Sequence, residues 1–245
     1  MSTLPFTPEE FADRFRAARR VGALTGAGLS TAAGIPDFRG PKGLYVTRAY
    51  DPETVFETNH FKRDPTPFYA FSRVFLGLLS DIQPTFTHRF LAEWEARGKI
   101  VCVATQNIDG LHERAGSRNV YPVHGGYENA ACLACGCEFA LTDYKPDVMA
   151  GNVPHCSCGG VIKPVVVFFG EQVRHLEAAA REAAACDFYL VLGSSLLVHP
   201  AAGLPLYAGG DVWIINKGEV PLHPGWRQAD TDLDEFFQAV AACLK

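Results

Sequence analysis

Five short apolar runs constrain what this chain can fold into. They are apolar at odd and even positions alike, without alternating polar residues, which is typical of strands buried on both faces. The runs are Val21–Thr25, Ile100–Thr105, Val165–Phe169, Phe188–Leu192 and Val212–Ile215. Helical patterns lie between them, and strands that alternate with helices favour a parallel sheet covered by helices on both sides. The sequence therefore predicts a doubly wound α/β domain.

The helical segments carry recognisable start signals. The first one opens with Thr7, Pro8 and Glu10, in the order expected of an N-cap threonine, a first-turn proline and the glutamate of a capping box. Apolar residues recur at helical spacing in four more segments. These are predicted at 67–79, 85–97, 176–185 and 232–244.

Four cysteines in two close pairs interrupt this pattern. Cys132 and Cys135 form the first pair, and Cys156 and Cys158 form the second. Two pairs of thiolates at such spacing are typical of a tetrahedral zinc site. Because sulfur would fill all four positions, the predicted Zn²⁺ is structural and takes no part in chemistry.

The cysteine pattern leaves alternatives open. The second pair has one intervening residue where two are usual, which would tighten its turn. Cys137 is a spare thiol that could replace Cys135 as a ligand, although the two-residue spacing favours Cys135. The remaining alternative is four unrelated cysteines in the core.

Length and composition limit the class of protein. A chain of 245 residues with 48% hydrophobic residues can form a large α/β domain with a smaller insertion. The net charge of −5 gives no general attraction for nucleic acid. No apolar run approaches the roughly 18–20 residues of a membrane span, and the first residues do not resemble a signal peptide. Metal-type cysteine spacing without such a signal predicts a cytoplasmic protein. The charge and the absence of a spanning run predict that it binds neither nucleic acid nor membrane.

Small and polar residues follow the apolar runs, where ligands bind in open parallel sheets. In Gly26-Ala27-Gly28-Leu29-Ser30 the two glycines would let the backbone approach a pyrophosphate. Thr31 stands where the dinucleotide fingerprint has its third glycine, so a structural tight turn explains this motif equally well. Two later runs end in residues that suit phosphate or ribose, or an ordinary turn: Gly193, Ser194, Ser195 and Asn216.

Other polar residues are harder to explain structurally. Gln106, Asn107 and Asp109 follow the second run, and their side chains would be costly to bury without ligands or mutual hydrogen bonds. Phe38-Arg39 lies in a segment that Pro36 and Gly40 keep from being helical. His124 directly precedes the cysteine segment, although a lone histidine is more often a satisfied polar residue than a catalyst.

Taken together, these motifs resemble the sirtuin family of Sir2-type NAD-dependent protein deacylases. The resemblance covers about residues 21–216 and keeps the family's order: GAGLS, GIPDFRG, TQNIDGLH, HG, paired cysteines, KPVVVFFGE, GSSLLVHP and IIN. It implies a Rossmann-like domain from residues 1–35, 82–126 and 164–245. A helical module at 36–81 and a zinc module at 127–163 would form an inserted small domain.

The resemblance also implies a role for each motif residue. His124 would be the general base, and Asn107 would assist cleavage of the nicotinamide bond. The residues implied to bind NAD are Gly26, Ala27, Gly28, Ser30, Phe38, Arg39, Gln106, Asn107, Asp109, Gly193, Ser194, Ser195 and Asn216. The zinc ligands would be Cys132, Cys135, Cys156 and Cys158.

The implied reaction consumes NAD as a co-substrate. An acyl group would move from a lysine side chain to ADP-ribose, with release of nicotinamide, and the partners would be acylated-lysine proteins or peptides. We expect a monomer. The alternatives are an ADP-ribosyltransferase or NAD hydrolase that uses the same pocket, a non-enzymatic NAD sensor, and a zinc-ribbon nucleic-acid binder.

The acyl preference is predicted from one helix. Sirtuins that prefer succinyl or malonyl groups carry a Tyr-x-x-Arg pair, whereas here Tyr69 is followed by Ser72 at the arginine position and Arg73 lies about 100° around the helix. We therefore expect neutral acyl groups such as acetyl. The apolar stripe Phe68, Phe71, Phe75 and Leu78 is interpreted as core, with an acyl channel as the alternative.

Val165–Phe169 and Leu197-Val198 resemble the two strands between which sirtuin substrates insert. Backbone pairing of this kind gives affinity with little dependence on sequence. Val165–Phe169 is thus expected to be a core strand whose ends serve the peptide.

Overall fold

The computed structural model describes residues 5–36, 51–221 and 223–245 and divides the chain into two units. The large unit comprises Met1–Ile35, Gln83–Val123 and Val173–Lys245, and the small unit comprises Pro36–Ile82 and His124–Gln172. Compared with the domain limits expected from sequence, the small unit also takes in residues 82, 124–126 and 164–172. None of the helices in the described ranges is long and apolar enough to cross a membrane.

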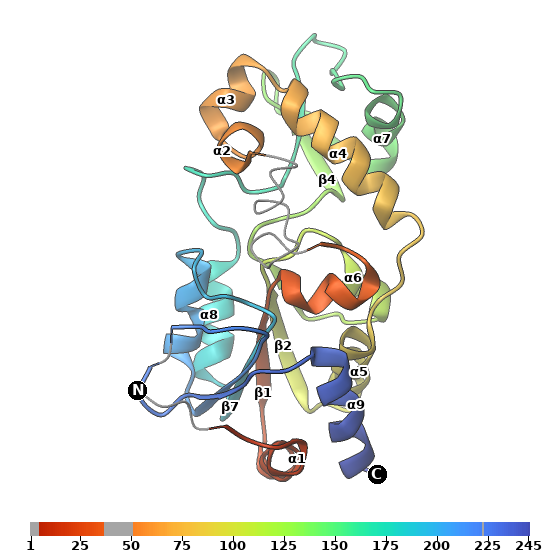
Figure 1. The fold of residues 1–245 in the computed structure, drawn as a ribbon. Helices are drawn as coiled ribbons and strands as arrows, with labels where there is room; N and C mark the ends of the chain where they lie inside the picture. The colour runs from red at the N-terminus through yellow and green to blue at the C-terminus, as the bar shows by residue number, and fades with distance from the viewer. Residues whose placement is uncertain (1–4, 37–50, 222) are drawn as a thin grey trace. The chain divides into compact units, whose positions relative to one another are not determined.

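The large unit contains a six-stranded parallel sheet in the order β3-β2-β1-β7-β8-β9. Its strands are β1 (Val21–Thr25), β2 (Ile100–Thr105), β3 (Val120–Pro122), β7 (Phe188–Leu192), β8 (Asp211–Ile215) and β9 (Arg227–Ala229). The three central strands β1, β2 and β7 run side by side (Figure 1). Four of the five predicted apolar runs are therefore strands of this sheet.

Helices cover both faces of the sheet, as the runs predicted. They are α1 (Pro8–Ala17), α5 (Phe86–Ala96), α6 (Leu111–Ala115), α8 (Leu176–Ala184) and α9 (Leu233–Cys243), with 3₁₀ helices η1 (Ala27–Ala33) and η2 (Ala201–Tyr207). Alternate strand residues enter two separate cores: Ala23 packs with α1, α5 and α9, whereas Leu24 packs with α8 and η2. Figure 1 shows α8 on one side of the strands and α5 and α9 on the other.

The first helix begins as its sequence predicts. The Thr7 hydroxyl accepts a hydrogen bond from the Glu10 amide, and the Glu10 carboxylate accepts one from the Thr7 amide. This reciprocal capping fixes the start of α1, so that Phe11 and Phe15 face the core and are fully buried. The four other predicted helices agree with α4, α5, α8 and α9 to within about a residue at each end.

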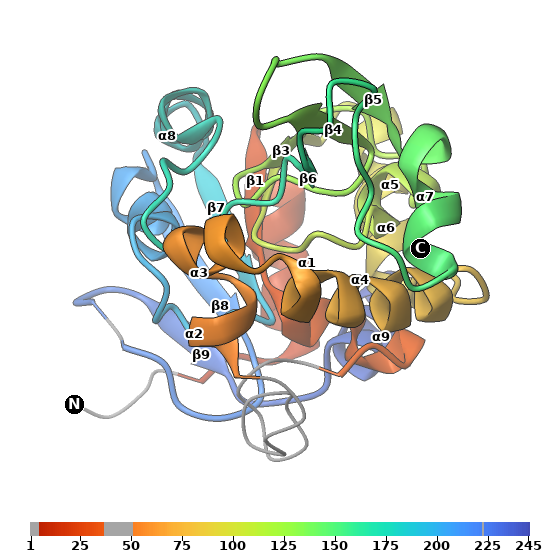
Figure 2. The same ribbon diagram turned by 90° about the horizontal axis from the view of Figure 1, so that it is seen from above.

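The small unit combines helices with a three-stranded antiparallel sheet in the order β5-β4-β6. Its elements are α2 (Pro52–Val55), α3 (Thr58–Arg63), α4 (Thr66–Leu79), β4 (Asn129–Cys132), β5 (Glu138–Ala140), α7 (Leu141–Met149) and β6 (Ile162–Pro164). Figure 2 shows α2, α3 and α4 grouped together. Three members of the predicted α4 stripe are buried in this unit, Phe68, Phe71 and Phe75, which supports their interpretation as core, whereas Leu78 is 38% exposed.

The prediction of a core strand at Val165–Phe169 is wrong. This segment follows β6 in the small unit and joins no strand of the parallel sheet. Val166 and Phe168 are buried, Val165 and Val167 are partly exposed, and Phe169 is 45% exposed. The run is apolar because its alternate residues fill the small unit. Its backbone amides bond to Asn129 at the start of β4, and to His124 and Phe56, instead of to strands of the parallel sheet.

Candidate functional site

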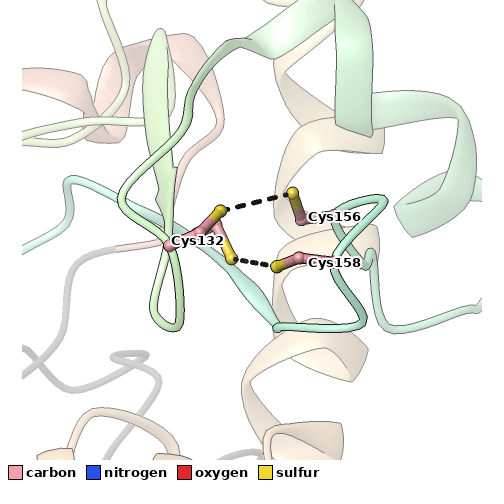
Figure 3. Close-up of side chains that lie close together, drawn as sticks. Cys132, Cys156 and Cys158 are labelled. Atoms are coloured by element: carbon pink, nitrogen blue, oxygen red, sulfur yellow. Dashed lines mark hydrogen bonds between the residues drawn. The ribbon is translucent and has the colours of Figure 1, made fainter.

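Four cysteines converge at one end of the small antiparallel sheet. Cys132 ends β4 and Cys135 lies in the turn that follows, while Cys156 and Cys158 lie in a second turn before β6. The sulfur atoms of all four lie within 4.8 Å of one another. The Cys132 and Cys158 sulfurs are 3.5 Å apart (Figure 3). Those of Cys135 and Cys156 are 3.7 Å apart.

This geometry fits a structural zinc ion. Zinc–sulfur bonds of about 2.3 Å in a tetrahedron place the sulfurs about 3.8 Å apart, close to the two distances above. The pair with one intervening residue, Cys156 and Cys158, reaches the cluster as well as the other pair does. Cys135 is the member that converges from its turn, and Cys137 is not part of the cluster. Gly136 and Gly159 adopt positive φ angles of 73° and 84°, which allow both turns to fold back sharply.

Backbone packing explains the glycines after β1. Gly28 donates its amide to the Gly193 carbonyl at 2.9 Å, and Gly26 donates to the Leu192 carbonyl at 3.0 Å. A side-chain carbon at Gly28 would lie 2.8 Å from the Gly193 Cα, and one at Gly193 would lie 2.4 Å from the Leu29 nitrogen. The loops after β1 and β7 therefore touch backbone to backbone. These glycines have a structural role that the sequence had suggested only as an alternative to pyrophosphate binding.

A buried polar cluster lies where β1 and β2 end. The Ser30 hydroxyl donates to the Asp109 carboxylate at 2.7 Å, and the Asn107 amide donates to Ser30 Oγ at 3.2 Å and to the Gly26 carbonyl at 3.1 Å. Ser30, Asn107 and Asp109 are each less than 10% exposed. Burial raises the pKa of the Asp109 carboxyl above its ordinary value, although its bonds from Ser30 and the Leu111 amide oppose that shift. The cluster thus holds an acid in surroundings that disfavour its charge.

The neighbouring strand ends extend this polar edge. Gln106 Nε2 donates to Ser194 Oγ at 3.1 Å, which joins the loop after β2 to the loop after β7. Ser194 is buried and Ser195 is partly exposed. The structure therefore brings together, in the large unit, the sequence-predicted residues that follow β1, β2 and β7.

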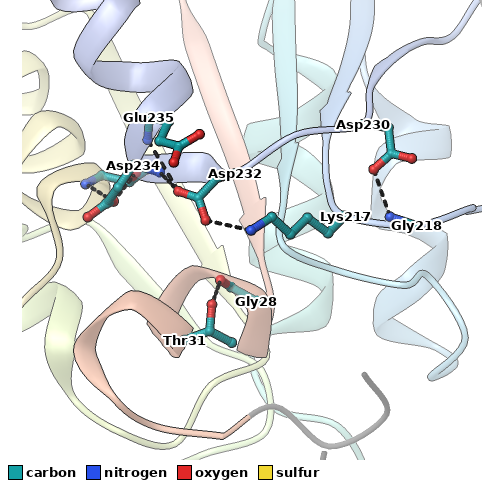
Figure 4. Close-up of polar contacts among 9 residues, drawn as sticks. Gly28, Thr31, Lys217, Gly218, Asp230, Asp232, Asp234 and Glu235 are labelled. Carbon is teal, nitrogen blue, oxygen red and sulfur yellow. Dashed lines mark hydrogen bonds and ion pairs between the residues drawn. The ribbon is translucent and has the colours of Figure 1, made fainter. Parts of the chain in front are cut away.

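Asn216 follows β8 in a loop that is fixed on several sides. Its amide donates to the Lys217 carbonyl at 2.8 Å, and its own backbone N–H donates to the Ala229 carbonyl at 3.2 Å. Lys217 Nζ lies 2.9 Å from the Asp232 carboxylate, and the Gly218 amide donates to Asp230 at 2.9 Å. Figure 4 shows the Lys217–Asp232 and Gly218–Asp230 contacts, together with the Thr31 hydroxyl bonded to the Gly28 carbonyl.

His124 lies in the small unit and begins the motif His124-Gly125. Its carbonyl accepts a hydrogen bond from the Val167 amide at 2.8 Å. Gly125 has a φ of +70°, and a side-chain carbon there would lie 1.8 Å from the Val165 carbonyl oxygen. Glycine is therefore required for the chain to pass this closely beside Val165–Phe169. Phe38 and Arg39, also predicted as site residues, lie outside the described residues.

Two pairs of contacting residues were not foreseen, although three of the four residues stand inside the quoted motifs. The first is a pair of fully buried histidines, His112 in TQNIDGLH and His88 on α5, whose ring centroids are 4.7 Å apart. The second is the ion pair of Lys163 and Glu171, which begin and end KPVVVFFGE. No spacing rule marks such pairs, because their partners are set by tertiary packing.

Comparison with known proteins is consistent with this site. The model of the Sir2 family matches residues 26–200, well over half of the chain. An NAD-dependent protein deacetylase of Sulfurisphaera tokodaii is 44% identical over 209 residues, covering 82% of this chain and 80% of the relative. One from Thermotoga maritima is 41% identical over 221 residues, covering 87% and 88%. A solved Sir2 structure with a deacetylated p53 peptide and 3′-O-acetyl ADP ribose is 37% identical, has a TM-score of 0.89, and matches 97% of this chain and 98% of its own.

Parallel sheet, cysteine cluster and polar strand ends together define a dinucleotide-binding α/β protein with a metal module. The chain belongs to the Sir2 family, the sirtuins.

Proposed function

We propose that the chain is an NAD-dependent protein-lysine deacylase, most active as a deacetylase, that transfers the acyl group to ADP-ribose and releases nicotinamide. The observation that carries the proposal is the buried cluster of Ser30, Asn107 and Asp109 in a member of this family. A carboxyl held where burial disfavours its charge costs stability, so a role toward a ligand explains its presence. The relatives named as NAD-dependent deacetylases and the Sir2 complex with an acetylated ADP ribose support the same reaction.

NAD as co-substrate would supply a ribose carbon that gains positive character as the bond to nicotinamide breaks. Asn107 and Asp109 would stabilise that charge, since both are polar, buried and held by Ser30. His124 would act as the general base that takes a proton from a ribose hydroxyl, a task suited to an imidazole at neutral pH. Fixing these side chains before the substrate binds would limit the reorganisation needed during the reaction.

The remaining sequence-predicted residues would hold the cofactor. In the proposed assignment they act through backbone and small polar groups at the strand ends: Gly26, Ala27, Gly28, Gln106, Gly193, Ser194, Ser195 and Asn216. Phe38 and Arg39 would contribute from the segment outside the described residues. Cys132, Cys135, Cys156 and Cys158 would bind Zn²⁺, and their convergence supports this role.

Contacts on α4 support the preference for neutral acyl groups. Ser72, at the position where a carboxylate-binding arginine would stand, is fully buried and bonds to the Phe68 carbonyl at 2.8 Å and to the Tyr127 hydroxyl at 2.9 Å. The Tyr69 hydroxyl donates to the Ile162 carbonyl, and burial raises its pKa far above the ordinary value. Neither side chain offers a cation to a succinyl group. We expect faster removal of acetyl than of succinyl from matched peptides, and the reverse order would refute this assignment.

The proposal extends to partners and location. The partners would be proteins or peptides carrying acylated lysine, and the protein would act as a cytoplasmic monomer without binding nucleic acid. The net charge of −5 supports the last point. Labelled NAD tests the reaction against its alternatives. A deacylase places the ADP-ribose label on a small acylated product, an ADP-ribosyltransferase places it on protein, and an NAD hydrolase yields free ADP-ribose.

A further inference from the structure

An ion pair in the small unit, Lys163 with Glu171, joins the two ends of the chain around the Val165–Gly170 segment. Lys163 lies in β6, and its Nζ is 3.0 Å from the Glu171 carboxylate and 2.8 Å from the Val166 carbonyl. The same ammonium group lies 3.9 Å from the centroid of the Phe168 ring. The two charged side chains are only 11% and 29% exposed, so solvent screens their attraction less than that of a surface pair.

Glu171 closes a tight turn at the end of this segment from two directions. Its amide donates to the Phe168 carbonyl at 3.0 Å, and its carboxylate accepts from the Phe168 amide at 2.9 Å. Gly170, inside the turn, has a φ of +89°. Both backbone polar groups of Phe168 are therefore taken by one residue, which in turn is held by Lys163.

The amides of the odd-numbered residues hold the segment along its other edge. Val165 donates to the Asn129 carbonyl, Val167 to the His124 carbonyl and Phe169 to the Phe56 carbonyl, at 2.7–2.9 Å. Successive residues of an extended chain direct these groups to opposite edges. The ion pair therefore restrains Val166 and Phe168, whereas β4 and the chain at His124 and Phe56 restrain the odd-numbered residues.

The restrained segment ends in exposed chain. Phe169 is 45% exposed and Gly170 is also exposed, directly before Glu171. A peptide that pairs with a protein backbone needs that backbone held in one extended conformation, because any ordering at binding is subtracted from the affinity. A rigid segment that leads into exposed backbone meets this need.

We propose that Lys163 and Glu171 are a positioning pair that fixes the Val165–Gly170 segment for recognition of the backbone of the acyl-lysine peptide. The proposal rests on the deacylase function and on the resemblance of this segment to the sirtuin substrate strand. Neither side chain touches the reacting atoms. Their charges neutralise each other and order the backbone beside them, so the pair acts on peptide binding and leaves the NAD site unchanged.

The test uses substitutions that remove the ion pair with little change in shape. In Lys163→Met the aliphatic stem is kept without the charge, Lys163→Arg restores a cation, and Glu171→Gln keeps the shape of the carboxylate. Arg97→Met is the matched control, because it breaks the exposed Arg97–Glu93 pair at the end of α5, in the large unit. Each variant is assayed for kcat and for the KM of acetyl-lysine peptide and of NAD. Peptide affinity is measured separately by fluorescence anisotropy.

We expect the peptide KM and Kd to rise about tenfold in Lys163→Met and in Glu171→Gln, as the loss of one charge-assisted contact implies. The KM for NAD and kcat should stay within about twofold, and Lys163→Arg should recover most of the affinity. The variant that combines Lys163→Met with Glu171→Gln should bind the peptide no more weakly than either single variant, since each substitution removes the same interaction. Arg97→Met should match the wild type.

Other outcomes overturn the proposal in distinguishable ways. An unchanged peptide KM in both single variants, with normal zinc content, would show that the pair does not position the segment. An equal fall in kcat and in the affinities for both substrates, or additive effects in the double variant, would indicate a general structural role. If the wild-type protein does not deacetylate the peptide at all, the proposed function fails, and the anisotropy measurement still decides whether the pair governs peptide binding.

Discussion

A buried pair of neutral histidines should make the large unit sensitive to acid. His88 Nδ1 lies 2.8 Å from the Thr85 hydroxyl, and His112 Nε2 lies 2.9 Å from the Thr25 hydroxyl. The other ring nitrogen of each histidine is buried and has no hydrogen-bond partner among the described residues. Burial, with a smaller contribution from Arg89, lowers the pKa of His88 to about 3, and burial lowers the pKa of His112 as well.

The size and sign of the effect follow from linkage. Because the folded form binds the proton more weakly than the unfolded form, stability is complete above the unfolded pKa of about 6.5 and falls as the pH drops toward the folded value of about 3. For His88 alone the full loss is about 5 kcal/mol, and about 2 kcal/mol is already lost at pH 5. Typical domains have a total stability of only about 5–15 kcal/mol, so this loss is measurable.

Urea unfolding at pH 7.5 and pH 5.0 measures this loss through tryptophan fluorescence. All three tryptophans, Trp94, Trp213 and Trp226, lie in the large unit, so the signal reports the unit that contains His88. The comparison variant is His88→Asn, whose side-chain oxygen can accept the Thr85 amide in place of Nδ1 but cannot take a charge.

We expect the wild type to lose about 2 kcal/mol more than the His88→Asn variant between these two pH values. An equal loss of unfolding free energy in the two proteins would refute the reasoning. It would mean that the acid sensitivity arises from other groups and that His88 titrates normally in the folded protein.

Three further predictions address the proposed site. His124→Ala should reduce turnover by about 100-fold or more, as loss of a general base does, while NAD affinity measured by calorimetry changes little; near-normal turnover would remove the proposed role. Cys132→Ala, or removal of zinc by a chelator, should expose the amides of the small antiparallel sheet to hydrogen exchange, and unchanged protection in metal-free protein would contradict a structural metal. Asp109→Asn should raise the thermal midpoint of unfolding at pH 7, since burial raises the pKa of this carboxyl and makes its ionised form costly. Turnover should nevertheless fall. A lowered midpoint would contradict the expected gain in stability.

Most helices and strands of the large unit could be predicted from the sequence, because they depend on residues that are close together in the chain. The reciprocal bonds of Thr7 and Glu10 depend on residues three apart, so the start of α1 could be predicted from composition and spacing alone. Runs in which odd and even positions are both apolar correctly predicted strands that are buried on two faces, as at Ala23 and Leu24. The spacing of the cysteine pairs likewise predicted a convergence of thiols.

The errors arose where an apolar run has more than one explanation. Val165–Phe169 has the composition of a buried strand, but its alternate amides bond to Asn129 at the start of β4 and to the non-helical residues His124 and Phe56. Such partners are distant in sequence, and no periodicity reports them. The close contact between Gly28 and Gly193 could not be predicted for the same reason. These residues are distant in sequence, and their lack of side chains allows the two loops to touch.

Mass spectrometry of the small-molecule products tests the central claim most directly. The purified protein is incubated with an acetyl-lysine peptide, with and without NAD. We predict nicotinamide and O-acetyl-ADP-ribose in amounts equal to the deacetylated peptide, and no deacetylation when NAD is omitted. Release of free acetate at the same rate without the dinucleotide would contradict it.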